Sequence, residues 1–496
     1  MPFSKLALGR SQDEKLFLFS HPHELPLILN HLSSENPAER SFYLKTLARS
    51  PERNQLYCIP QVLQCGFPQN IYTSYNRTEG EEDIWTYFTN AAQKSSVFLN
   101  QLIWMLEVSL FNPEQDLSST LGHHFYNKTL EIIKKDPEEW EVYNTESEYF
   151  EKFLQISASL IPKDPENFAK INNELEKLSK SVPANVYIPT NPENLVVGLR
   201  SDNGRPLQSA KRTPILITFL TRSKDSTLVH PTQCIFKVND DVRNDQLCLQ
   251  IIDLMQDILS KTGLSIYLRP YKVISTITHT SEGNQLSGII ECIPNCKSRD
   301  EIGKEGTESL YTYFLEKFGA ENSENFQRAK SNFIASMAGY AVASYILQIK
   351  DRHNGNILID EFGHIVHIDF GFILKISPAG NLRFERPGFK LTEEMIDVMG
   401  SRNSESFEYF KSLIIKGYLA IREQASSFIT LVSLMEHSGL TCFRKGAVTD
   451  FIKRFYLKMN VLDAVKKMNE KILRANNSFF TLWYDRIQLM QQQIEY

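Results

Sequence analysis

The stretch Asn356-Ile-Leu-Ile-Asp-Glu-Phe-Gly-His-Ile-Val-His-Ile-Asp369 decides how the centre of this chain is interpreted. Two short β-rich runs flank its Asp-Glu-Phe-Gly, which predicts an antiparallel hairpin with a tight turn near Gly363. Pairing centred on that turn sets Asn356 opposite Asp369. Directly opposed side chains lie roughly 4.5–5.5 Å apart at Cβ. We therefore expect an amide and a carboxylate oxygen that can share a hard cation such as Mg²⁺.

The residues around this hairpin have the spacing of a phosphoryl-transfer site. Asp351-Arg-His-Asn-Gly-Asn356 leads into it, and Asp369 opens Asp-Phe-Gly. Protein kinases place a catalytic aspartate five residues before a metal-binding asparagine, and a second metal-binding aspartate in Asp-Phe-Gly. Here His-Arg-Asp is inverted to Asp-Arg-His, and no Gly-x-Gly-x-x-Gly or Walker A sequence occurs. The alternative is a surface hairpin whose Asn and Asp cap turns, but the combination favours a kinase-like site with a different phosphate-binding loop.

Several further segments give this pattern a family resemblance. Together with Asp351–Asn356 and His367-Ile-Asp-Phe-Gly371, the segment Lys237-Val-Asn-Asp-Asp-Val-Arg-Asn-Asp245 resembles the phosphatidylinositol 3-/4-kinase superfamily. Val186–Glu193 and Gly288–Asp300 are most similar to the type III phosphatidylinositol 4-kinases, the alpha form first and the beta form next. The resemblance implies a bilobal, protein-kinase-like α+β catalytic domain preceded by an all-α helical (PIK) domain.

The resemblance also implies the nucleotide-binding residues. Lys237 would hold the phosphates of ATP, with Asp245 and Tyr271 behind it and Asp245 helping to orient the lysine. The segment from Glu291 to Ile293 would be the hinge that faces adenine. A further pair, Ser209 and Lys211, would lie in the turn that replaces a glycine-rich loop.

The catalytic roles follow in the same way. Asp351 and His353 would act on an inositol hydroxyl, one as base or orienter and the other stabilising the transferring charge; the sequence leaves open which does which. Asn356 and Asp369 would carry Mg²⁺, or Mn²⁺ in its place. The implied reaction transfers the ATP γ-phosphate to the 4-hydroxyl of phosphatidylinositol. The alternatives are a 3-kinase, a related Ser/Thr protein kinase and a scaffold pseudokinase.

Substrate choice is expected in the activation segment, Phe372 to Lys390. Its basic residues are Lys375, Arg383, Arg386 and Lys390, set against Glu385 alone. They are dispersed among apolar residues, which suits unphosphorylated phosphatidylinositol in an anionic membrane better than an inositide with extra phosphates. Arg383 stands where the resembling family usually has glycine. An aromatic, amphipathic run at 479–490 predicts a C-terminal helix that either contacts membrane or packs on the helical lobe.

Composition limits the remaining function classes. The chain has 496 residues, with 54 Lys and Arg against 59 Asp and Glu, a net charge of −5 that argues against nucleic-acid binding. Seven dispersed cysteines and no signal peptide predict a reducing, cytosolic compartment. We expect a peripheral enzyme on the cytosolic face of the plasma membrane or internal membranes, with recruiting scaffold proteins as further partners.

Periodicity divides the chain into three predicted domains. Residues 1–180 read as a helical accessory domain, 181–293 as the kinase N-lobe with its hinge, and 294–496 as the C-lobe. The uncharged run 331–349 is long enough to span a bilayer, but its polar residues favour a buried core helix. This length accommodates a catalytic domain and one helical domain, so we expect the long solenoid of alpha-type relatives to be absent or supplied by another protein.

Overall fold

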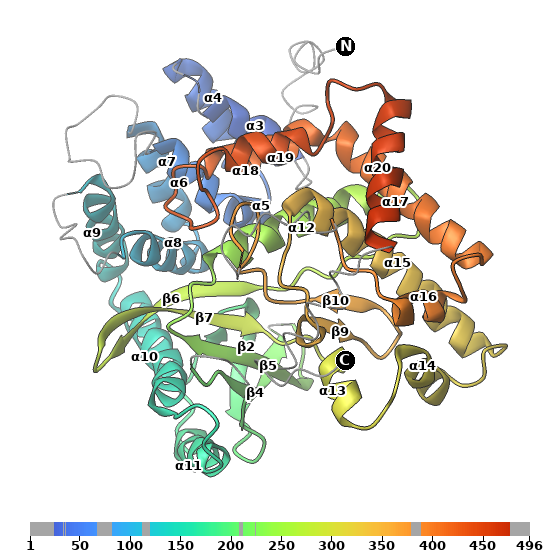
Figure 1. Ribbon diagram of the computed structural model, residues 1–496. Helices are drawn as coiled ribbons and strands as arrows, with labels where there is room; N and C mark the ends of the chain where they lie inside the picture. The colour runs from blue at the N-terminus through green and yellow to red at the C-terminus, as the bar shows by residue number, and fades with distance from the viewer. Residues whose placement is uncertain are drawn as a thin grey trace. The chain divides into compact units, whose positions relative to one another are not determined.

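The computed structural model describes residues 24–32, 34, 36–66, 82–111, 120–207, 212–223, 225–377 and 388–476. The chain forms two compact units (Figure 1). Unit 1 consists of Met1–Gln246, Tyr271–Cys292 and Thr430–Leu440, and unit 2 of Leu247–Pro270, Ile293–Ile429 and Thr441–Tyr496. Mixed helix and sheet in two units, with the expected helical block, agrees with the predicted bilobal kinase-like fold. The chain passes between the units after residues 246, 270, 292, 429 and 440, and the third of these positions lies inside the predicted hinge.

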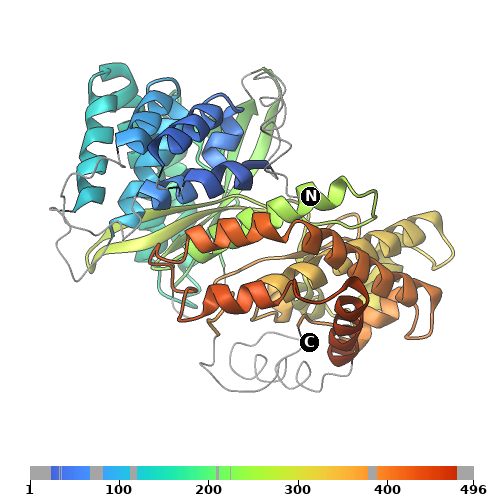
Figure 2. The same cartoon turned by 90° about the horizontal axis from the view of Figure 1, so that it is seen from above.

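The first part of unit 1 is helical, as predicted. Figure 2 shows these helices, coloured blue to teal, grouped beside one another. Asn36 and Asp136 accept backbone N–H bonds at the starts of α4 and α10, and proline follows each of them at the first helical position. The helices are α3 (Leu25–Leu32), α4 (Pro37–Leu47), α5 (Glu52–Tyr57), α6 (Ile59–Gly66), α7 (Glu82–Ala92), α8 (Ser96–Ser109), α9 (Leu121–Lys134), α10 (Pro137–Ser159) and α11 (Asn167–Ser179).

The rest of unit 1 is an antiparallel sheet, with the order β1-β2-β4-β5-β7-β6 and β3 paired to β4. The strands are β1 (Tyr187–Ile188), β2 (Asn191–Leu199), β3 (Arg205–Pro206), β4 (Ile215–Ser223), β5 (Val229–Val238), β6 (Val273–Thr280) and β7 (Gly283–Glu291). The predicted switch from helix to strand after residue 180 is confirmed. Residues 264–272, which precede β6, have no strand structure, because Leu268 N–H and Tyr267 N–H bond to Gln256 Oε1 (2.7 Å) and Ala335 O (3.2 Å).

Helix α10 and the sheet share one hydrophobic core. Phe150 and Phe153 of α10 pack against Phe219 of β4 and Phe236 of β5, with ring centroids 5.2–6.5 Å apart. All four side chains are almost fully buried. The predicted boundary at residue 180 therefore separates a helical part and a strand-rich part of a single compact unit.

Unit 2 is mostly helical. Its central helix is α15, Glu324–Leu347, in which sixteen residues are buried. The uncharged run 331–349 is thus a core helix, as predicted, and no helix of the described residues is both long and apolar enough to cross a bilayer. The other helices are α13 (Arg299–Lys304), α14 (Leu310–Phe318), α16 (Glu393–Met399), α17 (Glu405–Glu423), α19 (Ala447–Lys453) and α20 (Val461–Asn476); α12 (Arg243–Ser260) and α18 (Ala425–Leu434) each divide between the units.

A three-stranded sheet, ordered β10-β9-β8, completes unit 2. It contains the predicted hairpin, β9 (Ile357–Ile359) and β10 (Ile365–His367), together with β8 (Lys297–Ser298), which the sequence did not predict. The predicted register was wrong by one residue: Ile357 pairs with His367, so Asn356 is opposite Ile368, whose N–H donates to Asn356 O (3.1 Å). The loop has three residues rather than two, because Asp360 pairs with His364 and Gly363 takes a left-handed φ of +89°.

Candidate phosphoryl-transfer site

The catalytic loop begins where α15 ends. Gln348 takes a left-handed conformation that stops the helix, and Lys350 then turns back onto the segment after Asp-Phe-Gly. Lys350 N–H donates to Phe372 O (2.9 Å), and its ammonium donates to Gln348 O (3.2 Å) and Leu374 O. Leu374 N–H in turn donates to Leu347 O (2.9 Å). Residues 348–351 are therefore fixed against residues 372–374.

Arg352 joins the two halves of the motif. Its side chain is almost fully buried, and its guanidinium donates to the carbonyl oxygens of Ile368 (2.7 Å) and Asp369. It also reaches Lys350 O (3.0 Å) and Asn356 O (3.4 Å). A planar guanidinium with five donors suits such a cluster of acceptors, whereas an ammonium could not span it. Arg352 thereby links the backbone of Asn356 to that of Asp369, which compensates for the shifted register.

Asp351 and Asp369 share an unusual backbone conformation. Each has a φ of +60°, in the left-handed region that non-glycine residues rarely occupy. Such conformations cost free energy and persist where the surrounding structure imposes them, often at functional sites. Here the surrounding bonds are those of Lys350 and Arg352. The two predicted carboxylates thus lie at two of the left-handed positions of these segments, which also include Gln348 and Leu374.

His353 is oriented by the loop that follows it. Its Nδ1 accepts the N–H of Gly355 at 3.1 Å, so the neutral ring carries its proton on Nε2. Burial lowers the pKa of His353 below its usual value; the charges of Arg352 and Lys390 also lower it, while those of Asp351 and Asp369 oppose the shift. His353 is therefore a neutral hydrogen-bond donor at neutral pH.

Asn356 and Asp369 suit the hard cation that the sequence predicts. The Asn356 side-chain nitrogen donates to Asp351 O (3.0 Å), which leaves its amide oxygen as the atom suited to a cation. Among the described residues, no three His, Cys, Asp or Glu side chains gather into a metal site. Mg²⁺ prefers octahedral oxygen ligands and commonly takes one or two from carboxylates and the rest from phosphates and water. The donor set fits a cation that arrives with a nucleotide.

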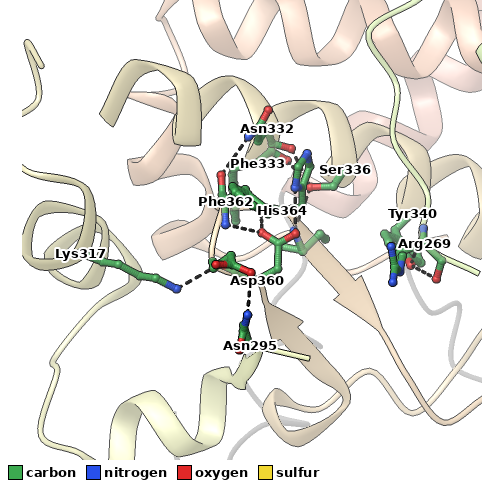
Figure 3. Close-up of polar contacts among 12 residues, drawn as sticks. Arg269, Asn295, Lys317, Asn332, Phe333, Ser336, Tyr340, Asp360, Phe362 and His364 are labelled. Carbon is green, nitrogen blue, oxygen red and sulfur yellow. Dashed lines mark hydrogen bonds and ion pairs between the residues drawn. The ribbon is translucent and has the colours of Figure 1, made fainter. Parts of the chain in front are cut away.

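The hairpin that carries these residues is fixed at its turn (Figure 3). The Asp360 carboxylate accepts the N–H groups of Phe362 (2.9 Å) and His364 (2.8 Å), and its other oxygen pairs with His364 Nδ1 (2.9 Å). From α15, Ser336 Oγ accepts Ile365 N–H (2.9 Å), and Asn332 donates to Phe362 O (2.9 Å). The central helix therefore determines where the strands leading to Asn356 and Asp369 begin.

The activation segment gives a mixed outcome. Lys375 is half-buried and pairs with Asp450 (2.7 Å). Lys390 is buried, and its ammonium donates to Asn354 Oδ1 at 2.9 Å inside the catalytic loop. It is not the surface cation that a membrane-facing role requires. Arg383 and Arg386 lie outside the described residues, as does the terminal run 479–490.

In unit 1, the described nucleotide-binding candidates lie on β5, in the first turn of α12, just before β6 and at the end of β7. Lys237 is half-buried on β5 and forms an ion pair with Asp240 (3.3 Å), a partner that the sequence did not single out. Asp245, in the first turn of α12, and Tyr271 are buried. Ser209 and Lys211 lie outside the described residues.

The predicted hinge is well ordered by backbone bonds. Glu291 N–H donates to Lys272 O (2.9 Å), and its carboxylate accepts Lys272 N–H (2.8 Å). Cys292 N–H donates to Gln233 O (3.0 Å), and the next residue, Ile293, is buried. The Glu291 side chain is thus occupied in holding β7 beside Lys272.

The sequence identified the catalytic pattern but not the residues that hold it. Arg352 was visible only as the middle of an inverted motif, although an arginine between two predicted catalytic residues was a usable signal. Asp240 lies within the segment from Lys237 to Asp245, but the sequence alone gave it no role. The burial of Lys390 had no local signal, because it depends on contact with a loop 36 residues earlier.

Comparison with known proteins agrees with this geometry. Residues 231–445 match the family described as phosphatidylinositol 3- and 4-kinase. Phosphatidylinositol 4-kinase alpha 2 of Arabidopsis thaliana is 39% identical over 82% of this chain and 77% of its own length. Phosphatidylinositol 4-kinase alpha 1 of the same plant is 38% identical over 93% of this chain, and phosphatidylinositol 4-kinase stt4 of Schizosaccharomyces pombe is 34% identical over 98%. The chain spans only 22% and 27% of those two relatives. It belongs to the phosphatidylinositol 3- and 4-kinase family.

Proposed function

We propose that the chain is a phosphatidylinositol 4-kinase, which transfers the γ-phosphate of ATP to the 4-hydroxyl of phosphatidylinositol at a cytosolic membrane face. The observation that carries the proposal is the joining of the catalytic loop to Asp-Phe-Gly through Arg352. The names of the relatives support the choice of lipid and hydroxyl.

Asp351 acts as the base that orients the inositol hydroxyl and accepts its proton. His353 supports this division of roles, because a neutral imidazole protonated on Nε2 donates a hydrogen bond more readily than it accepts a proton. Its Nε2–H stabilises charge on the transferring phosphoryl group. Catalysis then rests on positioning and charge stabilisation, without a covalent intermediate.

Asn356 and Asp369 hold the divalent cation, Mg²⁺ or Mn²⁺, which neutralises phosphate charge when bound. Lys237 binds the phosphates of ATP, and its ion pair with Asp240 holds the ammonium on the strand until the nucleotide arrives. Asp245, Tyr271 and the segment 291–293 complete the nucleotide-binding residues, together with Ser209 and Lys211. Lys375, Arg383 and Arg386 are the cations for the lipid headgroup.

The deciding experiment supplies the purified chain with Mg-ATP and phosphatidylinositol vesicles and identifies the product isomer by chromatography. We expect phosphatidylinositol 4-phosphate. Asp369→Asn removes a ligand charge and should abolish turnover without changing the melting temperature by more than a few degrees. Glu361→Gln, at the exposed tip of the same hairpin, is the matched control and should retain activity.

Each alternative has its own outcome in this experiment. A 3-phosphate product would replace the 4-kinase assignment with the 3-kinase. Phosphate on a protein substrate, with no lipid product, would indicate a related Ser/Thr protein kinase. ATP binding without either activity would indicate a scaffold pseudokinase, which the presence of Lys237, Asp351, Asn356 and Asp369 argues against.

A further inference from the structure

Residues 455–462 (Phe-Tyr-Leu-Lys-Met-Asn-Val-Leu) run from the connection after α19 into the first two residues of α20. They expose most of their large apolar side chains, and Figure 1 shows this part of the chain between the two helix labels. The exposed fractions are 50% for Leu457, 36% for Met459, 52% for Val461 and 73% for Leu462. Single exposed apolar residues are common, but four within six positions form a patch of the kind that marks an interaction site. We call residues 457–462 the apolar connection.

The apolar connection is held in place by hydrogen bonds. Arg422 of α17 donates to the carbonyl oxygens of Phe455 (3.0 Å), Tyr456 (3.2 Å) and Met459 (2.6 Å). At its far end, Asn460 Oδ1 accepts the N–H of Asp463 (2.9 Å) at the start of α20. The apolar side chains are therefore presented on a fixed backbone, and a partner that binds them has little chain entropy to overcome.

The surrounding sequence is strongly basic. Residues 453–474 contain seven lysines and arginines and two acids, a net charge of +5 in a chain whose total is −5. On α20, Ala464, Met468 and Ile472 are buried, while Leu462, Lys466 and Leu473 lie on its exposed side. Apolar side chains beside lysines on an exposed surface complement the anionic headgroups and acyl boundary of a membrane.

The chain just before the apolar connection, residues 445–454, is linked to the described parts of the activation segment. Lys375 of that segment bonds to Lys445 O (3.1 Å) and pairs with Asp450 of α19, immediately before the connection. At the other end, Arg454 donates to Tyr345 O (3.0 Å), and Tyr345 is the residue that a side chain at Gly388 would meet at 3.1 Å. A surface bound by the connection would thus adjoin the segment expected to choose the headgroup.

We propose that the apolar connection inserts into the headgroup–acyl boundary of an anionic membrane and holds the activation segment at the lipid surface. The inference rests on the proposed function in one respect, because only a lipid substrate makes a bilayer the natural partner of this face. A protein partner would also cover apolar side chains. The basic surroundings favour the bilayer, as does the ion pair of Lys375 in the activation segment with Asp450 on the preceding helix α19.

The test measures vesicle binding separately from catalysis. The double variant Leu457→Asn/Leu462→Asn changes two exposed side chains and leaves the Arg422 bonds to the backbone intact. Co-sedimentation with vesicles of phosphatidylcholine, phosphatidylserine and phosphatidylinositol should show a partition coefficient at least about tenfold below that of the unaltered chain, given the transfer free energy of two leucines. Vesicles of phosphatidylcholine alone should bind the unaltered chain more weakly, because the basic residues then lack a partner.

A matched control changes two exposed apolar residues in unit 1. Leu228 and Val229 are 65% and 50% exposed, and the variant Leu228→Asn/Val229→Thr should bind vesicles as the unaltered chain does. Phosphorylation of a water-soluble short-chain phosphatidylinositol provides the second readout. The connection variant should retain that activity while losing turnover on vesicles.

Unchanged vesicle binding by the connection variant would overturn the proposal and leave a protein partner as the occupant. Equal loss of activity on soluble and vesicle substrate would also overturn it, since the connection would then support the catalytic fold. If the unaltered chain phosphorylates neither lipid, the proposed function fails, yet co-sedimentation still tests the membrane contact by itself.

Discussion

Arg352 links Asn356 to Asp369, two residues that the register of the hairpin does not pair. A hairpin with an odd number of loop residues cannot set Asn356 directly opposite Asp369, because each pairing then shifts by one position. The guanidinium instead bonds to the backbone of both residues and lies 5.4 Å from the centre of the Phe370 ring. The two predicted cation ligands are related through that side chain, which bonds to their backbone oxygens.

Lys390 gives a test that separates positioning from substrate binding. Lys390→Met removes the ammonium that bonds to Asn354 inside the catalytic loop. Charged hydrogen bonds of this kind contribute about 1.5–3 kcal/mol, so we expect kcat to fall on the order of 10- to 100-fold. The KM for phosphatidylinositol should change little, because the buried ammonium does not face the lipid. Steady-state kinetics on vesicles measures both constants.

Two controls complete the test. Lys390→Arg retains a cation and should recover part of kcat, whereas Lys411→Met, at a partly exposed ion pair with Glu408, should leave both constants unchanged. A raised KM with normal kcat would instead return Lys390 to the headgroup-binding role.

The β9–β10 hairpin shows what the sequence could and could not predict at the scale of an element. Two short runs rich in β-branched residues around Asp-Glu-Phe-Gly identified both strands, because residue type and turn residues are local properties. The register depended on Gly363 taking φ +89° and on Asp360 accepting two N–H groups, which adds a third loop residue. The two-residue strand β8 pairs with β9 from 60 residues away and has no local signal.

Gly363→Ala tests the importance of that turn. A Cβ at this position would lie 2.9 Å from Ala329 Cβ and O on α15, in addition to the cost of the positive φ. Gly306→Ala is the matched control, since Gly306 has φ +95° with nothing within 4 Å of the added carbon. We expect Gly363→Ala to destabilise unit 2 by about 1–3 kcal/mol more than the control, by the cost of overpacking. Thermal and urea unfolding compare the stability of the two variants. An equal loss of unfolding free energy in both would show that α15 shifts to accommodate the added carbon.

At the scale of the whole molecule, the sequence predicted the order of the helical and strand-rich segments better than it predicted which segments pack into one compact unit. Hydrophobic periodicity identified the helical block, the strand-rich part and the last, mostly helical part in the right order. The spacing of apolar residues depends only on neighbouring positions in the sequence. It divided 1–180 from 181–293, yet α10 and the strands share the core of one unit. That packing depends on aromatic contacts between residues such as Phe150 and Phe236, 86 positions apart, which periodicity does not encode.

Unit 1 has a buried acid at the junction between its helical part and its sheet. Glu146 of α10 accepts the N–H of Tyr187, the first residue of β1, at 3.4 Å. Burial raises the pKa of Glu146 to about 7, and the Tyr187 hydrogen bond only partly opposes that shift. A carboxyl group in an unfolded chain has a pKa of roughly 4.3. The folded protein therefore keeps this proton over a pH range in which the unfolded chain has lost it.

Stability should consequently fall as the pH rises between the two pKa values. The folded state binds more protons than the unfolded state in that range, which makes the slope of the unfolding free energy with pH negative. Glu146→Gln keeps an acceptor for Tyr187 and removes the titration. We expect this variant to gain up to about 3 kcal/mol over the unaltered chain above roughly pH 7, and almost nothing near pH 4.5. Urea unfolding across this pH range measures the difference in unfolding free energy between the variant and the unaltered chain. The contributions of the other titrating groups are the same in both proteins and cancel. Glu148→Gln, exposed on the same helix, controls for the change of residue type; a Glu146→Gln difference independent of pH would show that Glu146 is ionised in the folded protein.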